Sequence, residues 1–124
     1  MGGAMTRPGD YTRGADSVAS RFSISRFGGP TTYRTSTVSV GITATRILGN
    51  NPRRVQFTIY NRSVNSIDLD YVSSVTANGG IPLSASSGVA TSTIEDDGET
   101  VVGEIYGIAS AASSSVFVVE VMRV

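Results

Sequence analysis

The feature that most constrains the fold is the stretch at residues 51–71, which contains two segments of polar–apolar alternation. The segments are residues 54–61 and 66–71, and a period of two is typical of strands with one buried face. Their apolar positions are Val55, Phe57, Ile59, Ile67, Leu69 and Tyr71. We therefore expect a hairpin that turns near residues 61–65. Because two strands cannot bury an apolar face alone, the rest of the chain must supply an opposing layer.

Further β-type segments follow one another along the chain, separated by turn signals such as Asn78-Gly79-Gly80. The other expected strands are residues 35–41, 42–48, 75–83 (a segment that contains the turn), 90–94, 100–109 and 116–124. Pro82 fits an edge strand or the start of a strand. Residues 95–98 fit an Asp-Gly turn, and no segment shows a helical period. Many short strands at a spacing of about 8–12 residues indicate a sandwich or barrel.

The expected fold is accordingly all-β: an antiparallel β-sandwich or barrel, jelly-roll or Ig-like, at residues 35–124. An extended N-terminal arm at residues 1–34 precedes it, since the first thirty residues hold six glycines and no sustained period. The last segment, residues 116–124, is apolar on both faces. Its second face is covered either by another subunit or by the chain's own arm.

Composition excludes most catalytic designs. The chain has no cysteine, histidine or lysine, so thiol nucleophiles, structural zinc sites, histidine bases and Schiff-base chemistry are ruled out. We expect no enzyme, no cofactor and no metal. Asp68 and Asp70 share a strand face and are expected in solvent, as is the Arg53-Arg54 pair. The acidic run at residues 95–99 lacks the spacing of an EF-hand loop.

Charge is divided unevenly between the arm and the body. Residues 1–35 carry five arginines against two aspartates, a net charge of +3, and residues 36–124 carry five arginines against eight acids, a net charge of −3. This is too weak for a nucleic-acid binder but suits an arm that lies on an acidic neighbour. No apolar run is long enough to span a membrane, and no signal peptide is evident, so we expect a soluble protein.

The arm repeats an Arg-Phe pair within residues 20–29, which predicts a short strand that adds to the sheet edge of a neighbour. Alternatively, its phenylalanines fold back on the chain's own body. The residues expected to bind a partner are Arg21, Phe22, Ile24, Arg26, Phe27 and Arg34.

Three runs of the body resemble a small β-domain that recurs in virion structural proteins of tailed phages. They are ILGNNPRRVQFTIYNRSVNSIDLDY, VTANGGIPLSASSG and VVGEIYGIASAASSSVFVVEV, within residues 43–121. The pattern holds an Asn-Pro-x-Arg turn, an Asn-Gly-Ile-x-Leu segment in which this chain has an additional glycine, and a Gly-x-Ile-Tyr-x-Ile-Ala-Ser strand, none of them catalytic.

The resemblance implies a virion structural part, and two functions compete. One is a head decoration or cement protein on the capsid surface, a homo-oligomer for which a trimer is favoured, that contacts the major capsid protein or other virion proteins through its arm. The other is a fibre- or spike-associated module that binds a host receptor or glycan through the loops at residues 78–80 and 95–99. The arm favours the decoration function, since a domain at the tip of a fibre does not need a long N-terminal segment that binds other chains.

Overall fold

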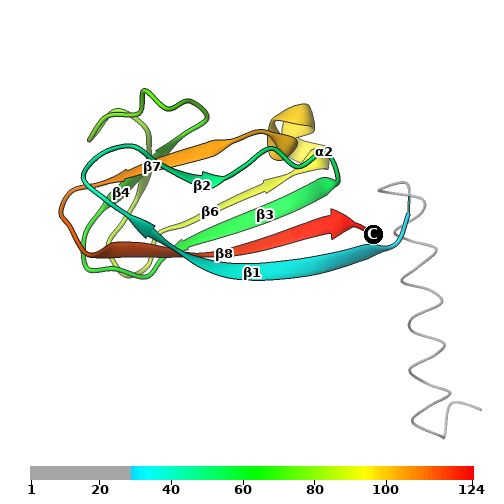
Figure 1. Cartoon of the computed structure of the whole chain (residues 1–124), viewed down its shortest axis with the longest axis horizontal. Coiled ribbons are helices and arrows are strands. Elements are labelled where there is room, and N and C mark those ends of the chain that lie inside the picture. The colour runs from blue at the N-terminus through cyan, green and yellow to red at the C-terminus, as the bar shows by residue number, and fades with distance from the viewer. Residues whose placement is uncertain (1–28) are drawn as a thin grey trace, which may run out of the picture. The chain divides into compact units, whose positions relative to one another are not determined.

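A computed structural model describes residues 29–124, and these form two four-stranded β-sheets (Figure 1). The first sheet has the strand order β1-β8-β3-β6 and the second β2-β7-β4-β5. The strands are β1 (Thr31–Val40), β2 (Thr45–Leu48), β3 (Arg54–Asn61), β4 (Ile67–Asp70), β5 (Ile81–Leu83), β6 (Val89–Thr93), β7 (Ile105–Ala109) and β8 (Ser114–Arg123). The pairs β2–β7, β3–β6, β3–β8, β4–β5 and β4–β7 are antiparallel. The predicted all-β antiparallel sandwich is confirmed.

The chain divides into two compact units, of which Tyr33–Met122 is the larger. The described part of the other is residues 29–32 with Arg123 and Val124, where the backbone N–H of Val124 donates to the carbonyl of Pro30 at 3.0 Å. The arm predicted at residues 1–34 lies mostly outside the described residues. Its last four residues, 31–34, are the first residues of β1.

The core lies between the sheets and is built from the alternating inner residues of the strands. Every predicted inner residue of β3 and β4 is buried: Val55, Phe57, Ile59, Ile67 and Leu69. Burying each of these side chains contributes about 1.5–3 kcal/mol relative to exposing it. Tyr71, also predicted to face the core, is exposed instead, because β4 ends at Asp70. Ile42, at the start of the strand expected at residues 42–48, is exposed too and lies in the connection between β1 and β2.

The predicted hairpin at residues 54–61 and 66–71 is wrong. The strand β3 pairs with β6 and β8, whereas β4 pairs with β5 and β7 in the other sheet. The two strands therefore face one another across the core, and residues 62–66 cross between the sheets. Alternation requires only that one face be buried, and two facing strands satisfy this as well as two paired ones do.

Residues 94–102 also differ from the expectation of a turn followed by a strand. They form one helical turn, α2 (Ile94–Asp97), and a 3-10 helix, η2 (Gly98–Val102). Thr93 caps α2 by accepting a hydrogen bond from the N–H of Asp96 at 3.2 Å, and Gly98 ends it with a φ of 61°. Val101 is buried and anchors η2 to the core. No helix among the described residues is long and apolar enough to cross a membrane.

Four strands lie at the edges of the two sheets. They are β1 and β6 in the first sheet and β2 and β5 in the second. Pro82 lies in β5, so the expected edge position of this proline is confirmed. The last strand, β8, lies between β1 and β3, with Val116 and Val118 fully buried on its inner face and Phe117 half-buried on the other.

Candidate functional site

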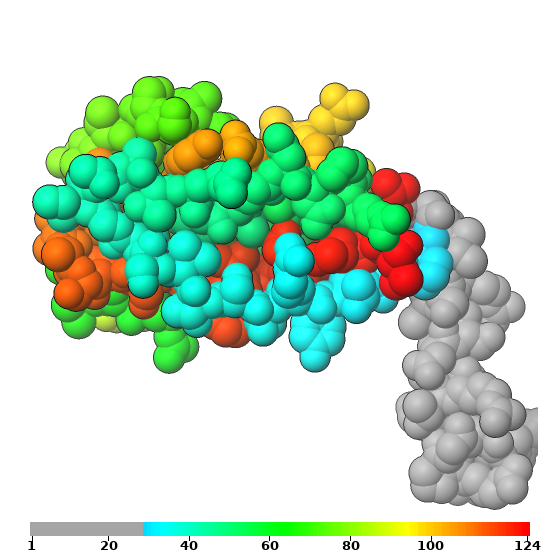
Figure 2. All heavy atoms as spheres, viewed as in Figure 1, coloured from blue at the N-terminus to red at the C-terminus, as the bar shows by residue number. Residues whose placement is uncertain are grey.

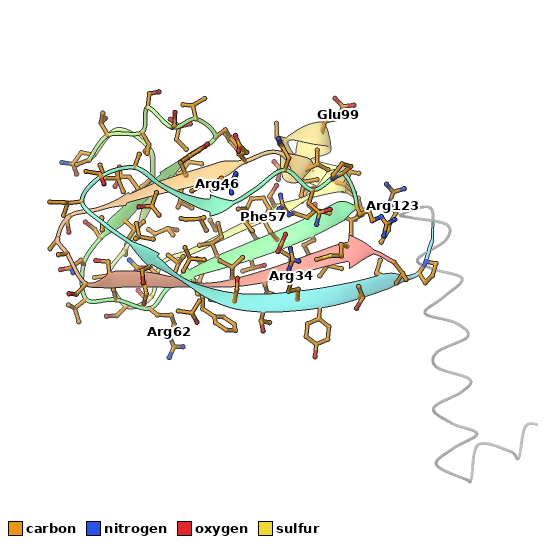
Figure 3. All side chains as sticks on the ribbon, viewed as in Figure 1. Arg34, Arg46, Phe57, Arg62, Glu99 and Arg123 are labelled. Atoms are coloured by element: carbon orange, nitrogen blue, oxygen red, sulfur yellow. The ribbon has the colours of Figure 1, made fainter. Side chains whose placement is uncertain are left out.

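An open groove of about 310 Å³ runs along one side of the sandwich, between β6 of the first sheet and β4 and β5 of the second. Its floor is part of the core and consists of Phe57, Leu69 and Ile105. Its rim carries two exposed apolar side chains, Tyr71 and Ile81, which are 43% and 45% accessible, and the edge strand β6 borders it from Val89 to Ser92. Figure 3 labels Phe57 on β3, between the two layers of strands. We call this the β5–β6 groove.

The local sequence explains why this side stays open. β5 is only three residues long and contains Pro82, so the second sheet ends early at this edge. The approach to β5 is held by Gly80, whose N–H donates to Oδ2 of Asp68 at 3.1 Å. A Cβ at residue 80 would clash with the carbonyl oxygen of Leu69, so only glycine fits this position.

Two carboxylates flank the apolar floor of the groove. Oδ1 of Asp70 accepts the N–H of Tyr71 at 2.6 Å. Oδ2 of Asp97 accepts the hydroxyl of Ser92 at 2.6 Å and the N–H of Thr93 at 3.3 Å. In the described part of the chain neither carboxylate forms an ion pair, and each keeps an oxygen that accepts none of these hydrogen bonds. The groove therefore combines an apolar floor with a negative border, which suits a ligand that is apolar and basic.

A second polar cluster lies on the opposite open side, between β1 and β2. Arg54 is 1% accessible, and its Nε donates to Oε2 of Glu120 at 2.8 Å. Its two terminal nitrogens donate to three backbone carbonyls, those of Gly49, Val101 and Gly103, at 2.7–3.0 Å. Arg54 thus joins β3 to β8, to η2 and to the loop that follows β2. The expectation that Arg54 lies in solvent is wrong, because a β-bulge between residues 54 and 56 turns this side chain inward beside Val55.

Arg34 completes this cluster from the solvent side. It is the one predicted partner-binding residue within the described part of the chain, and its Nη2 donates to Oε1 of Glu120 at 2.8 Å. Its side chain is 63% accessible and is directed from β1 across the neighbouring β8 (Figure 3). Figure 2 shows this side of the sandwich, with β1 in cyan beside the blue-green segment that contains β2. The other five predicted residues, Arg21, Phe22, Ile24, Arg26 and Phe27, lie outside the described residues.

The two guanidinium groups set the ionisation of Glu120. Burial by itself raises the pKa of this carboxyl, but hydrogen bonds and charge from Arg34 and Arg54 outweigh burial, so the pKa lies below its ordinary value. Glu120 therefore stays ionised in the folded protein at neutral pH. A groove of about 520 Å³ lies beside the cluster. Since the donors of Arg54 already have partners inside the protein, the cluster holds the fold together.

A buried amide organises the end of the sandwich where β3 crosses to β4. Nδ2 of Asn61 donates to the carbonyls of Asn65, Leu83 and Ser84 at 2.8–3.1 Å. Its Oδ1 accepts the N–H and the hydroxyl of Ser63 at 2.9 and 2.8 Å. Asn61 therefore ties the crossing to the end of β5. Within residues 29–124, no buried side-chain nitrogen or oxygen lacks a hydrogen-bond partner.

The aspartate pair on β4 is split. Asp68 is buried and accepts the Gly80 bond, whereas Asp70 is half-buried at the β5–β6 groove. The expectation of a fully solvated face is wrong for Asp68, because the loop before β5 folds over it. Among the described residues no group of three or more His, Asp or Glu side chains is placed to hold a metal ion.

Sequence reasoning missed the groove and the Arg54–Glu120 pair. Pro82 signalled the edge at β5, but nothing in the sequence indicates which edge of the other sheet lies opposite. The inward positions of Arg54 and Glu120 depend on one bulge, which alternation does not reveal.

No protein-family model and no curated protein sequence matches this chain. Among solved structures, one described as "Bacillus endospore appendages form a novel family of disulfide-linked pili" is similar at 14% identity. The match covers 76% of this chain and 88% of that one, with a TM-score of 0.46. At that score the likeness supports no argument, and the sandwich assignment rests on the strand pairing of this chain itself.

Proposed function

We propose that this chain is a structural subunit of a tailed-phage particle, a decoration or cement protein that stabilises the head through subunit contacts and its N-terminal arm. The observation that supports this most directly is the β5–β6 groove, where Tyr71 and Ile81 are exposed beside a floor of core residues. Clustered apolar side chains around an opening of this kind mark protein-binding surfaces. The resemblance of residues 43–121 to phage virion domains is the reason for proposing a phage particle as the assembly.

The polar groups of the sandwich favour the same function. The hydrogen bonds of Arg54, Glu120 and Asn61 join strands and loops within the domain. A domain that is held together in this way is suited to a structural role between larger proteins. The sheet edges at β1 and β6 offer unpaired backbone groups for strand addition by other chains.

Loading onto isolated shells tests the proposal. The full-length protein is mixed with expanded, undecorated capsids of the phage that encodes it, and bound protein is counted per shell after sedimentation. We expect saturable loading at a fixed stoichiometry. We also expect Ile81→Asp to weaken loading at least about tenfold, because a charge on the groove rim is desolvated on binding.

A matched control distinguishes the groove from general surface effects. Ile42 is also exposed, at 62%, but lies in the β1–β2 connection on the other open side, so Ile42→Asp should load normally. If the unmodified protein does not load onto shells, the decoration function is wrong.

A glycan- or receptor-binding module of a fibre or spike is the second candidate. The exposed ring of Tyr71 lies at the groove with the carboxylates of Asp70 and Asp97, and sugars are commonly bound by an aromatic face beside such acceptors. Ile81 and Asp97 also place the loops at residues 78–80 and 95–99 at its two borders. In a glycan-binding assay, Tyr71→Ala should abolish any signal while Tyr33→Ala, at an even more exposed tyrosine, should not. Loading of shells without glycan binding excludes this candidate.

A further inference from the structure

The geometry points to one occupant of the β5–β6 groove: residues 21–27 of a second copy of this chain. We propose that this segment adds as a fifth strand beside β6 and places Phe22 and Ile24 in the groove. The inference rests on the proposed function, because it names the contact by which subunits join on the particle.

The register of β6 shows that its outer edge can accept a strand. The N–H of Thr93 donates to Asp97 rather than to β3, so Thr93 faces away from β3. In an antiparallel pair such outward-facing residues alternate with hydrogen-bonded ones. Thr91 and Val89 therefore also direct their N–H and C=O groups to the free edge. The hydrogen bond from the N–H of Asn61 to the carbonyl of Gly88, at 2.8 Å, agrees with this alternation. It shows that Gly88, the residue before Val89, directs its backbone groups toward β3.

The pattern of the segment matches the groove. In an extended strand Phe22, Ile24 and Arg26 share one face, because side chains alternate with a period of two. When that face is directed between the sheets, the phenyl and sec-butyl groups meet Phe57 and Leu69 on the groove floor. The groove volume of about 310 Å³ accommodates these two side chains.

Charge complements the apolar match. Arg26 follows Phe22 and Ile24 on the same face, and the groove is bordered by the carboxylates of Asp70 and Asp97. No described arginine forms an ion pair with either of them. A guanidinium beside two such carboxylates gains charge-assisted hydrogen bonds and fixes the register of the added strand.

The length of the tether decides in favour of a second copy. A strand added beyond β6 would lie four strand spacings from β1, about 19 Å. Only three residues separate Phe27 from Thr31, the first residue of β1, and four residue steps span at most about 14 Å. The chain's own segment therefore cannot pair with its own β6, whereas that of a neighbour can.

Disulfide trapping tests this directly, since the chain contains no cysteine. The single variants Ile24→Cys and Ile81→Cys are mixed under mild oxidation, and heterodimers are measured on non-reducing gels. Position 81 lies on the groove rim, so docking should make crosslinking at least about tenfold faster than random collision allows. The matched control mixes Ile24→Cys with Ile42→Cys on the opposite side of the sandwich.

Two results would overturn the proposal. One is equal crosslinking at positions 81 and 42. The other is a double variant, Ile24→Cys with Ile81→Cys, that closes within one chain while the mixed single variants do not react. The latter places the segment in its own groove.

A charge exchange supplies an independent readout of self-association by light scattering. Arg26→Asp and Asp70→Arg should each weaken self-association several-fold, and mixing the two variants should restore it, because the altered segment then meets the altered groove. If mixing restores nothing, the pairing of Arg26 with Asp70 is wrong.

The shell-loading and crosslinking experiments test the decoration function and the docking of residues 21–27 independently. Normal loading of shells without the crosslink between positions 24 and 81 overturns the docking and leaves the decoration function standing. The crosslink without shell loading retains the docking and overturns decoration.

Discussion

Nε of Arg54 donates to Oε2 of Glu120 at 2.8 Å, and this buried ion pair links the central strands β3 and β8 across a β-bulge. Both side chains are almost inaccessible, and three backbone carbonyls take the other donors of the guanidinium. A buried charge is tolerated when its partners are this complete, and it is costly when one of them is removed.

Replacing the carboxylate should therefore destabilise the protein strongly. We expect Glu120→Gln to lower the free energy of unfolding by about 3 kcal/mol, because the Arg54 charge is left buried without an opposite charge. Arg34→Gln removes the exposed partner of the same carboxylate and should cost at most about 1 kcal/mol. Urea denaturation of the two variants measures the difference, and equal losses would show that Glu120 contributes no more than a surface charge.

The carboxyl of Glu120 should also make the free energy of unfolding depend on pH in the acid range. The pKa of Glu120 is lowered in the folded protein, so on acidification the unfolded chain takes up this proton first. The contribution of Glu120 is then fully present above the ordinary value of 4.5 and is lost as pH falls through the lower folded value.

Urea midpoints of the unmodified protein and of Glu120→Gln, measured between about pH 7 and pH 3, should therefore converge at the acid end. A gap that stays constant over this range would contradict the assignment.

The amide of Asn61 should matter more than its size suggests. Asn61→Ala removes the side-chain donor of the Leu83 and Ser84 carbonyls and the acceptor of the Ser63 N–H, whereas the Ser63 hydroxyl and the Asn65 carbonyl keep their bond to each other. We expect a loss of about 2–3 kcal/mol in the free energy of unfolding. Asn50→Ala at an exposed asparagine should change it by less than about 0.5 kcal/mol. Similar small losses in both variants would show that the Asn61 network is dispensable.

The body should fold without the arm. The core residues all lie between Val40 and Val118, so deletion of residues 1–30 should leave a cooperative unfolding transition and a β-type circular dichroism spectrum. The same truncated protein should not load onto shells. If it does not fold, residues 1–30 contribute to the core, and the division of the chain into arm and body is wrong.

The pattern of residues was sufficient for the fold class and for much of the core. Alternation at Phe57, Ile59, Ile67 and Leu69 identified inner faces that are buried in the structure. It did so because a strand has only two faces, and one-sided burial leaves a period of two in the sequence. Pro82 marked an edge strand for an equally local reason, since proline has no N–H to donate.

Only the tertiary structure decided which strands pair and which polar groups enter the core. The segments at residues 54–61 and 66–71 have the same alternation whether they pair or face each other, so the sequence could not separate the two arrangements. The inward turn of Arg54 depends on one bulge, and the β5–β6 groove depends on two edges that meet from different sheets. Strand faces follow from local periodicity, whereas these features arise from contacts between residues far apart in the chain.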